Sequence, residues 1–420
     1  MAASGSPWKN QLTAFGHFEG RALRLSGAGQ TTAAGSPPAR LPIGAMRRRT
    51  EDWRSSPEAF LLRRTTRGAA RAAALAACLA VPIATPAVAS TLARSAHLGS
   101  VPTPRNTTTR GIVLRADYDF GNPDALCSDG TDVWAANPSN GSVTEFAAAT
   151  GELVRVIDAK KDDFRSPGGI ATDGVHVWVA NTYGRSVTEL SARSGQLVRV
   201  IDGPQYELLY PSAIAVDARH VWVASGAAGT VTEFSASTGA LVRVIGGSSY
   251  DFAHPDAIAS DGTHVWAANA LGASITELRA STGALVRVIS GDGFNLPDAL
   301  GLRSNTLWVA NGSNTVSELA ASSGALVRLV HGNRLGLVHP DAIALDGTSV
   351  FVSNISGNSV TELDARTGKL VRVIRGARYR FDDPVALVAT GPLAWVVNEA
   401  GDSATGFLTT SGALVHELFG

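Results

Sequence analysis

The sequence predicts an all-β protein, and within that class a seven-bladed β-propeller of four-stranded antiparallel blades. The chain has 44 Gly in 420 residues, and its 17% of charged residues lies below the usual share of about 25%. An aromatic residue recurs every 42–44 residues, at Trp134, Trp178, Trp222, Trp266, Trp308, Phe351 and Trp395. A proline precedes each of them by eleven residues, at Pro123, Pro167, Pro211, Pro255, Pro297, Pro340 and Pro384. This period, filled with short β-type runs, is typical of propeller blades and not of helical hairpins.

Charge and cysteine content exclude several classes of protein. Lys plus Arg and Asp plus Glu both total 36, so the net charge is zero. We therefore expect no nucleic-acid partner, because such proteins carry a basic surface. Two Cys cannot build a disulfide scaffold.

The chain before the repeats divides into three segments. Residues 1–45 are rich in Gly, Ala, Ser and Pro and show no apolar period, so they are expected to be disordered, or an upstream extension before a true start at Met46. Residues 46–89 have the pattern of an export signal, and residues 90–110 that of a linker. The propeller is expected over residues 111–420.

The export signal is predicted from three features in order. Arginines follow Met46, an apolar run covers residues 72–83, and the small-x-small sequence of residues 87–89 offers a cleavage site before Ser90. The apolar run is shorter than the roughly 20 residues of a spanning helix, so we expect no membrane span after cleavage. A lipoprotein box ending at Cys78 and a twin-arginine signal are weaker alternatives. The expected location is secreted, periplasmic or on the cell surface.

The fourth repeat shows the strands of one blade. Short β-type runs cover residues 257–259, 264–268, 274–278 and 285–289, separated by turn sequences such as Asp-Gly and Ser-Thr-Gly. The three-residue loop before the fourth run predicts a hairpin with a bulge. This register places a Glu of the third strand opposite an Arg of the fourth.

The Glu and Arg repeat together and are lost together. The pairs are Glu145 and Arg155, Glu189 and Arg199, Glu233 and Arg243, Glu277 and Arg287, Glu318 and Arg328, and Glu362 and Arg372; the seventh repeat has Gly406 and His416. This pattern predicts a cross-strand ion pair. Taken as exposed, each pair is worth about 0.2–1 kcal/mol.

The ends of the ring are expected to meet in blade seven. Residues 112–115 resemble a fourth strand, although the seventh repeat already has one at residues 414–418. The early segment is therefore predicted to pair with blade seven and to cover its open edge.

The repeat resembles those of the YVTN and NHL-like β-propellers. It reads Pro-x-Ala-Ile-Ala-x-Asp-Gly-x-x-Val-Trp-Val-Ala-Asn, then Val-Thr-Glu-Leu and Thr-Gly-x-Leu-Val-Arg-Val-Ile, over residues 111–420. The resemblance implies an exported bacterial protein and includes relatives of virginiamycin B lyase. It is specific for fold and weak for function, because such propellers have many roles.

Candidate binding residues gather where the loop into each first strand meets the loop after each second strand; we call this side of the ring the mouth face. The residue after each repeat Pro is Asp124, Gly168, Ser212, Asp256, Asp298, Asp341 and Val385. The second strands end in Asn137, Asn181, Ser225, Asn269, Asn311, Asn354 and Asn398. Blades four to six thus predict an acidic arc, with Asp124 beyond blade seven.

This pattern has a binding and a structural interpretation. The candidate ligand-binding residues are Asp124, Asp256, Asp298, Asp341, Asn269, Asn311, Asn354, His254 and His339. Oxygen-rich arcs suit Ca²⁺, Mg²⁺ or a ligand with several hydroxyl or amine groups. Repetition in most blades favours the structural interpretation, in which Asp and Asn cap turns, and the two His are solvated loop residues.

The sequence therefore predicts a monomeric, exported, non-catalytic binding or interaction module that contacts an unidentified protein or small molecule on the mouth face. We assign no resident cofactor and no catalytic residue, and the metal ligands stay open, with Ca²⁺ and Mg²⁺ as the candidate ions. The alternative is a metal-assisted lyase or hydrolase of the virginiamycin B lyase type, as the resemblance implies. His254 with Asp256, or His339 with Asp341, would then supply the base and the carboxylate. A purely structural surface protein is a third interpretation.

Overall fold

The structure is a computed structural model that describes residues 112–115, 117–158, 164–291 and 293–420. The expected upstream extension, export signal and linker lie outside the described residues. Within the described residues, the chain forms seven antiparallel four-stranded blades arranged as a β-propeller, as the repeat predicts.

The blades follow one another in chain order. Their strands are β2 (Ala125–Ser128), β3 (Asp132–Asn137), β4 (Ser142–Ala147) and β5 (Leu153–Asp158) in blade one; β6 (Pro167–Thr172), β7 (His176–Asn181), β8 (Ser186–Ser191) and β9 (Leu197–Asp202) in blade two; β10 (Pro211–Val216), β11 (His220–Ser225), β12 (Thr230–Ser235) and β13 (Leu241–Gly246) in blade three; and β14 (Pro255–Ser260), β15 (His264–Asn269), β16 (Ser274–Arg279) and β17 (Leu285–Ser290) in blade four.

The remaining blades repeat the plan. Their strands are β18 (Pro297–Arg303), β19 (Thr306–Asn311), β20 (Thr315–Ala320) and β21 (Leu326–Val330) in blade five; β22 (Pro340–Leu345), β23 (Ser349–Asn354), β24 (Ser359–Asp364) and β25 (Leu370–Arg375) in blade six; and β26 (Pro384–Thr390), β27 (Leu393–Asn398), β28 (Ser403–Leu408) and β29 (Leu414–Phe419) in blade seven. Short 3₁₀ turns at η2 (Pro204–Tyr206), η3 (Asn333–Leu335) and η4 (Ala377–Tyr379) lie in the loops into blades three, six and seven.

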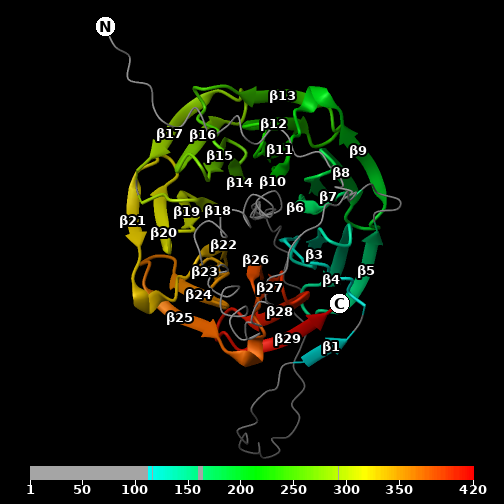
Figure 1. Cartoon of the computed structure of the whole chain (residues 1–420), viewed down its shortest axis with the longest axis vertical. Helices are drawn as coiled ribbons and strands as arrows, with labels where there is room; N and C mark the ends of the chain where they lie inside the picture. Colours follow the sequence, from blue (N-terminus) through cyan, green and yellow to red (C-terminus); the bar gives the residue numbers. More distant parts are fainter. Residues whose placement is uncertain (1–111, 116, 159–163, 292) are drawn as a thin grey trace, which may run out of the picture. The chain divides into compact units, whose positions relative to one another are not determined.

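The first strand of each blade lies innermost and the fourth lies at the rim (Figure 1). Each first strand contacts the first strand of the next blade, and β26 of blade seven contacts β2 of blade one. The sheets therefore close into a ring and do not form an open stack.

The early segment closes blade seven as predicted. Strand β1 (Ile112–Arg115) pairs in parallel with the outer edge of β29, with Ile112 opposite His416 and Arg115 opposite Phe419. Blade seven is thus a five-stranded sheet that contains both the first and the last described strands. This pairing covers an edge that would otherwise present unpaired backbone groups.

Packing between blades explains the repeating aromatic residue. Trp178 is fully buried and belongs to one apolar cluster with Val221, Val223 and Phe234 of the next blade. An aromatic side chain buries about 150–250 Å², worth about 4–6 kcal/mol at roughly 25 cal/mol per Å². Every residue of β6 is buried, because the sheet is covered on both faces.

The predicted Glu–Arg register is confirmed, but the expected exposure is wrong. Glu145 lies opposite Arg155, and the chain shifts register directly after Glu145, as the bulged hairpin requires. Across the six pairs the Arg Nε to Glu Oε2 distance is 2.6–3.2 Å. The Glu side chains are at most 8% exposed, whereas the Arg side chains are 27–31% exposed. The pairs lie between blades, where desolvation of the carboxylate opposes the ion-pair attraction.

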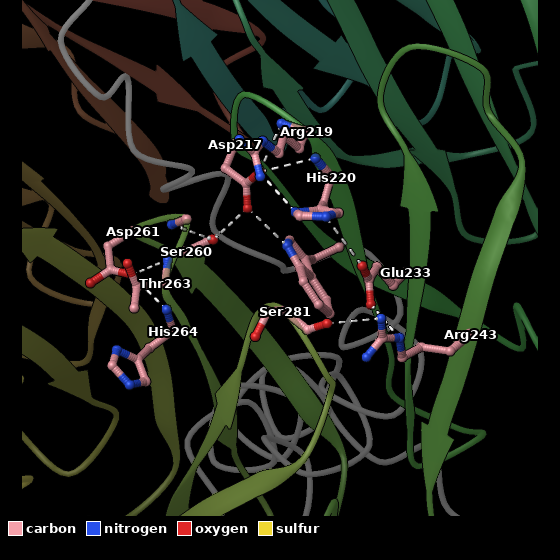
Figure 2. A network of polar contacts seen from close by, with 12 residues as sticks. Asp217, Arg219, His220, Glu233, Arg243, Ser260, Asp261, Thr263, His264 and Ser281 are labelled. Carbon is pink, nitrogen blue, oxygen red and sulfur yellow. Dashed lines mark hydrogen bonds and ion pairs between the residues drawn. The ribbon is translucent and has the colours of Figure 1, made fainter.

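Blade three shows how such a pair reaches its neighbour (Figure 2). Arg243 Nε lies 2.8 Å from Glu233 Oε2, and Arg243 Nη2 donates to the Ser281 carbonyl of blade four at 3.3 Å. On the other side of the carboxylate, His220 Nε2 lies 3.6 Å from Glu233 Oε1. Arg243 therefore pairs with a buried carboxylate and joins two blades, and the corresponding Arg of blades one, four, five and six also donates to a carbonyl of the next blade.

A second contact joins the same two blades at the turn after β10. Asp217 Oδ2 accepts hydrogen bonds from Trp222 Nε1 at 3.1 Å and from Ser260 Oγ of blade four at 2.8 Å (Figure 2). Burial raises the pKa of Asp217, but hydrogen bonds from the Arg219 backbone, Ser260 and Trp222 outweigh it, and the net pKa is lowered. The side of the ring with these turns is opposite the mouth face.

The junction between blades seven and one uses aromatic groups in place of an ion pair. His416 stacks on Trp395 with ring centroids 5.5 Å apart, and a Cβ at Gly406 would lie 2.9 Å from the Trp395 ring. Trp395 Nε1 donates to the Ala148 carbonyl of blade one at 2.8 Å. The joint loss of Glu and Arg in this repeat makes room for the indole.

Burial raises the pKa of Glu145 from 4.5 to about 7, and the Arg155 charge opposes this rise. A raised carboxyl pKa stabilises the fold below its unfolded value, and this contribution is lost as the pH rises through the folded value. Glu145→Gln cannot titrate. Between pH 5 and pH 8 we therefore expect the native protein to lose about 1–3 kcal/mol of its free energy of unfolding relative to E145Q.

Urea unfolding at several pH values measures this difference. Glu189→Gln is the matched control. Burial raises the pKa of Glu189 as well, but the charges of Arg199 and of His176, whose Nε2 lies 3.6 Å from Glu189 Oε1, oppose this rise. We expect a smaller pH-dependent difference for E189Q. A constant difference between E145Q and the native protein at all pH values would contradict the assignment.

Candidate functional site

The mouth face is assembled by strand register. Pro255 begins β14 opposite Asn269, which ends β15 and lies opposite Ser274 at the start of β16. The loop into blade four and the loop between its second and third strands therefore lie side by side, as shown by the hydrogen bond from Ala270 N to His254 O at 3.0 Å. The same arrangement recurs around the ring.

The residue before each repeat Pro adopts a left-handed backbone conformation, which the sequence did not predict. Its φ angle is 49–61° at all seven positions, namely Asn122, Ser166, Tyr210, His254, Leu296, His339 and Asp383. A residue before proline normally prefers an extended conformation, and a side chain in the left-handed region is strained. The closed turn imposes this conformation and sets seven side chains around the mouth face.

The four candidate aspartates occupy the predicted places at the start of first strands or just before them. Asp124, Asp256, Asp298 and Asp341 are only 4–7% exposed. The first strands of blades four, five and six are consecutive neighbours in the ring. Asp256, Asp298 and Asp341 therefore belong to three neighbouring blades. Asp124 lies in blade one, beyond Val385 of blade seven, and blades two and three have Gly168 and Ser212 at this position.

His254 is held by one of these carboxylates. Its Nδ1 lies 2.9 Å from Asp256 Oδ1, and its side chain is 32% exposed. The imidazole also packs on Gly226 of blade three, where a Cβ would lie 3.2 Å from His254 Cε1. His254 is thus a positioned side chain between two blades and not a freely solvated loop residue.

His339 is differently placed from His254, and the two belong to different blades. It is 6% exposed, its backbone N–H donates to Asn314 Oδ1 at 2.7 Å, and its Nδ1 lies 3.3 Å from Ser356 Oγ. The expected solvated loop histidine is therefore wrong here. Its ring packs beside Gly312, next to the Asp298 carboxylate.

The three candidate asparagines are fully buried and bond within their blades. Asn269 Nδ2 donates to Ser274 Oγ at 3.0 Å and to Thr276 Oγ1 at 2.8 Å. The Thr276 hydroxyl in turn donates to the Tyr250 carbonyl in the loop into blade four, at 2.6 Å. This relay ties the loop to the blade; its partners are hydroxyls, whereas the turn-capping interpretation expected backbone N–H groups.

The other two asparagines also donate within their blades, and Asn354 Oδ1 in addition accepts a hydrogen bond from Val338 N at 3.3 Å, as the turn-capping interpretation predicts. Asn311 Nδ2 donates to Ser317 Oγ at 3.2 Å, and Asn354 Nδ2 to Thr361 Oγ1 at 3.0 Å. In blade six the relay continues from Thr361 to the Leu335 carbonyl at 2.8 Å. These side chains form the frame beneath the candidate site.

Two Gly residues that support the histidines were missed from the sequence. The residue after the second-strand Asn or Ser is Gly only in blades three and five, at Gly226 and Gly312, and the next blade in each case has His before its Pro. The signal was therefore present as a joint occurrence in neighbouring repeats. It becomes interpretable only when the two loops are known to touch.

An apolar group on the mouth face was also missed. Tyr183 in the loop of blade two is 55% exposed, and Leu271 in the loop of blade four is 66% exposed. The Tyr183 ring makes an edge contact with Tyr210, with centroids 5.7 Å apart. The equivalent loop positions in blades one, five and six are Ser139, Ser313 and Ser356.

The donor set for a metal ion is incomplete in the described residues. Among residues 112–115, 117–158, 164–291 and 293–420, no group of three or more His, Cys, Asp or Glu side chains is placed to hold a metal ion. The acidic arc thus distributes charge around the ring and does not converge on one point.

The comparisons with known proteins identify the fold alone. The sequence matches no protein-family model and no curated protein. The structure resembles that of a streptogramin B lyase, with a TM-score of 0.57 and 12% identity over 68% of this chain and 93% of the other. It also resembles hydrazine synthase of Kuenenia stuttgartiensis, with a TM-score of 0.57 and 17% identity over 73% of this chain and 99% of that one. The WD40 repeats of RRP9 give a TM-score of 0.55 and 14% identity over 64% and 85% of the two chains.

None of the helices in the described part of the chain has the length and apolar character that crossing a bilayer requires.

The relay predicts the cost of removing one asparagine. Asn269→Ala should lower the free energy of unfolding by about 1–3 kcal/mol, because Ser274 and Thr276 lose a buried partner. Asn269→Ser is the matched control, since blade three carries Ser225 at this position. Urea unfolding measures both variants, and we expect the smaller loss for N269S. Equal stability of N269A and the native protein would show that the amide has no structural role.

Proposed function

We propose that this protein is an exported β-propeller of the YVTN or NHL-like type that acts as a non-catalytic binding module through its mouth face. The observation that carries the proposal is the uneven distribution of carboxylates: the neighbouring blades four, five and six each contribute a nearly buried Asp, blade one contributes Asp124, and blades two, three and seven contribute none. A repeat that served only to hold blades together would not require this unevenness.

The arc suits a ligand with several amine or hydroxyl groups. Two unit charges 4 Å apart attract by about 4 kcal/mol at an effective dielectric constant of about 20, so carboxylates at the edge of a core favour cationic groups. Their spread over three blades fits a ligand with several such groups better than a single ion. His254 and Asp256 stand at the end of the arc.

The lyase alternative is weaker. Its base and carboxylate could be His254 and Asp256, whose side chains are 2.9 Å apart. Its metal has no matching donor set among the described residues, so we derive no step that involves a metal. The similarity to streptogramin B lyase, at 12% identity, supports only the shared fold.

Thermal unfolding with spermine tests the binding proposal. At constant ionic strength, saturating spermine should raise the melting temperature by a few degrees, since a ligand at 100 times its Kd adds about 2.7 kcal/mol. The triple variant Asp256→Asn, Asp298→Asn and Asp341→Asn should lose this rise. Ca²⁺, Mg²⁺ and a chelator are run in parallel; a rise with Mg²⁺ that the triple variant loses would favour the lyase.

The control variant removes the same charge from the opposite face. Asp129→Asn, Asp261→Asn and Asp346→Asn keep the side-chain oxygens that accept backbone N–H groups in the turns. We expect this variant to respond to spermine as the native protein does. An equal loss in both triple variants would reduce the effect to overall charge and contradict a site on the mouth face.

A further inference from the structure

The mouth face carries an apolar arc on blades two to four, which we call the Tyr183 arc; it consists of Tyr183, Tyr210, Gly226, His254 and Leu271. Tyr183 and Leu271 are 55% and 66% exposed. The corresponding loop residues are Ala227 and Ala400 in blades three and seven and Ser139, Ser313 and Ser356 elsewhere. Large apolar side chains at this loop position therefore occur on one side of the ring only.

Direct contacts make the Tyr183 arc continuous. The Tyr183 and Tyr210 rings meet at 76° with centroids 5.7 Å apart. Gly226 N donates to the Tyr210 carbonyl at 3.0 Å, and the same Gly supports the His254 ring. Leu271 N donates to the Ala253 carbonyl at 3.1 Å, beside His254. Rings, backbone and aliphatic side chain thus follow one another along three neighbouring blades.

The arc ends at a polar pair. Asp256 Oδ1 lies 2.9 Å from His254 Nδ1, so the imidazole is held in one orientation at the place where the apolar and acidic sides of the mouth face meet. Tyr hydroxyls, an imidazole and a carboxylate offer both donors and acceptors. The aromatic faces beside them offer apolar contact.

We propose that the Tyr183 arc binds a neutral sugar unit of an oligosaccharide, with the aromatic rings against the C–H face of a pyranose and His254 and Asp256 at its hydroxyl rim. The assignment rests on the proposed function, since it names the ligand class of the same face. A pyranose ring combines an apolar face with a rim of hydroxyl groups, and these match the two parts of the arc.

A protein partner fits this surface less well. A specific protein interface needs about 800 Å² on each side, with an apolar centre and a polar rim. Here the large apolar residues of the loops between second and third strands stop after blade four, and Val338, 45% exposed in the loop into blade six, stands apart from them. The loops between second and third strands of blades five to seven carry Asn314, Asn358 and Asp402. The Oδ1 atoms of these three side chains accept backbone N–H groups of the next blade, at 2.7–3.0 Å. On that half of the face, these loop side chains hold neighbouring blades together.

Isothermal titration with cellotetraose, maltotetraose and tetra-N-acetylchitotetraose tests the assignment on the full chain. We expect at least one of the three to bind with a Kd below 1 mM. Tyr183→Ala should weaken this binding at least tenfold, and Tyr183→Phe, which keeps the ring face, should change it less than threefold. Y183A installs the residue that blades three and seven carry at this position, so the fold should persist.

Val175→Ala is the matched control, because Val175 is 63% exposed on a turn of the opposite face. It should bind the sugar like the native protein. The proposal is overturned if none of the three oligosaccharides binds at a concentration ten times the expected Kd limit of 1 mM. It is also overturned if Y183A leaves the binding unchanged. If spermine stabilises the protein through the acidic arc while no sugar binds, the binding module stands and the sugar assignment is wrong. If neither spermine nor any of the sugars binds, the proposed binding module and the sugar assignment are both wrong.

Discussion

Each blade of this protein can bury its two faces only against its two neighbours, and this constraint governs the whole ring. It explains why the inner three strands are buried on both faces and why an aromatic side chain recurs between sheets. It also explains why the Glu of each ion pair is desolvated and joined through Arg to the next blade. In an open stack, each end blade would expose one apolar face to water. The last blade therefore packs against the first, and the ring closes.

The same packing fixes the positions of the loops on the mouth face. A buried amide, a hydroxyl and a loop carbonyl form a relay in blade four, so the loop that carries His254 is anchored from beneath. The residue before each Pro has a left-handed backbone conformation and places one side chain per blade in the loops of that face. Since the frame is common to the blades, single residues such as Gly226 or Tyr183 change the chemistry of the mouth face while the blade keeps its fold.

Contacts within a blade could be predicted from the sequence, and contacts between blades could not. Glu145 and Arg155 are ten residues apart in one hairpin, so turn length alone determines their register. The burial of that Glu depends on the neighbouring sheet, which no local pattern describes, and its exposure was therefore misjudged. For the same reason Asp256 was placed correctly at the start of its strand, whereas the packing of His254 on Gly226, 28 positions earlier, became visible only in three dimensions.

The parallel pairing of β1 with β29 has a consequence for how the molecule is held. Ile112 lies opposite His416, near the end of β29 that is remote from the mouth face, and on the outermost strand of the rim. A tether acting through Ile112 would thus pull on the circumference, and it would load the β1 backbone ladder in shear along the strand. The loops that carry Tyr183 and His254 lie on the mouth face, so they would be on the side of the ring remote from such an attachment point.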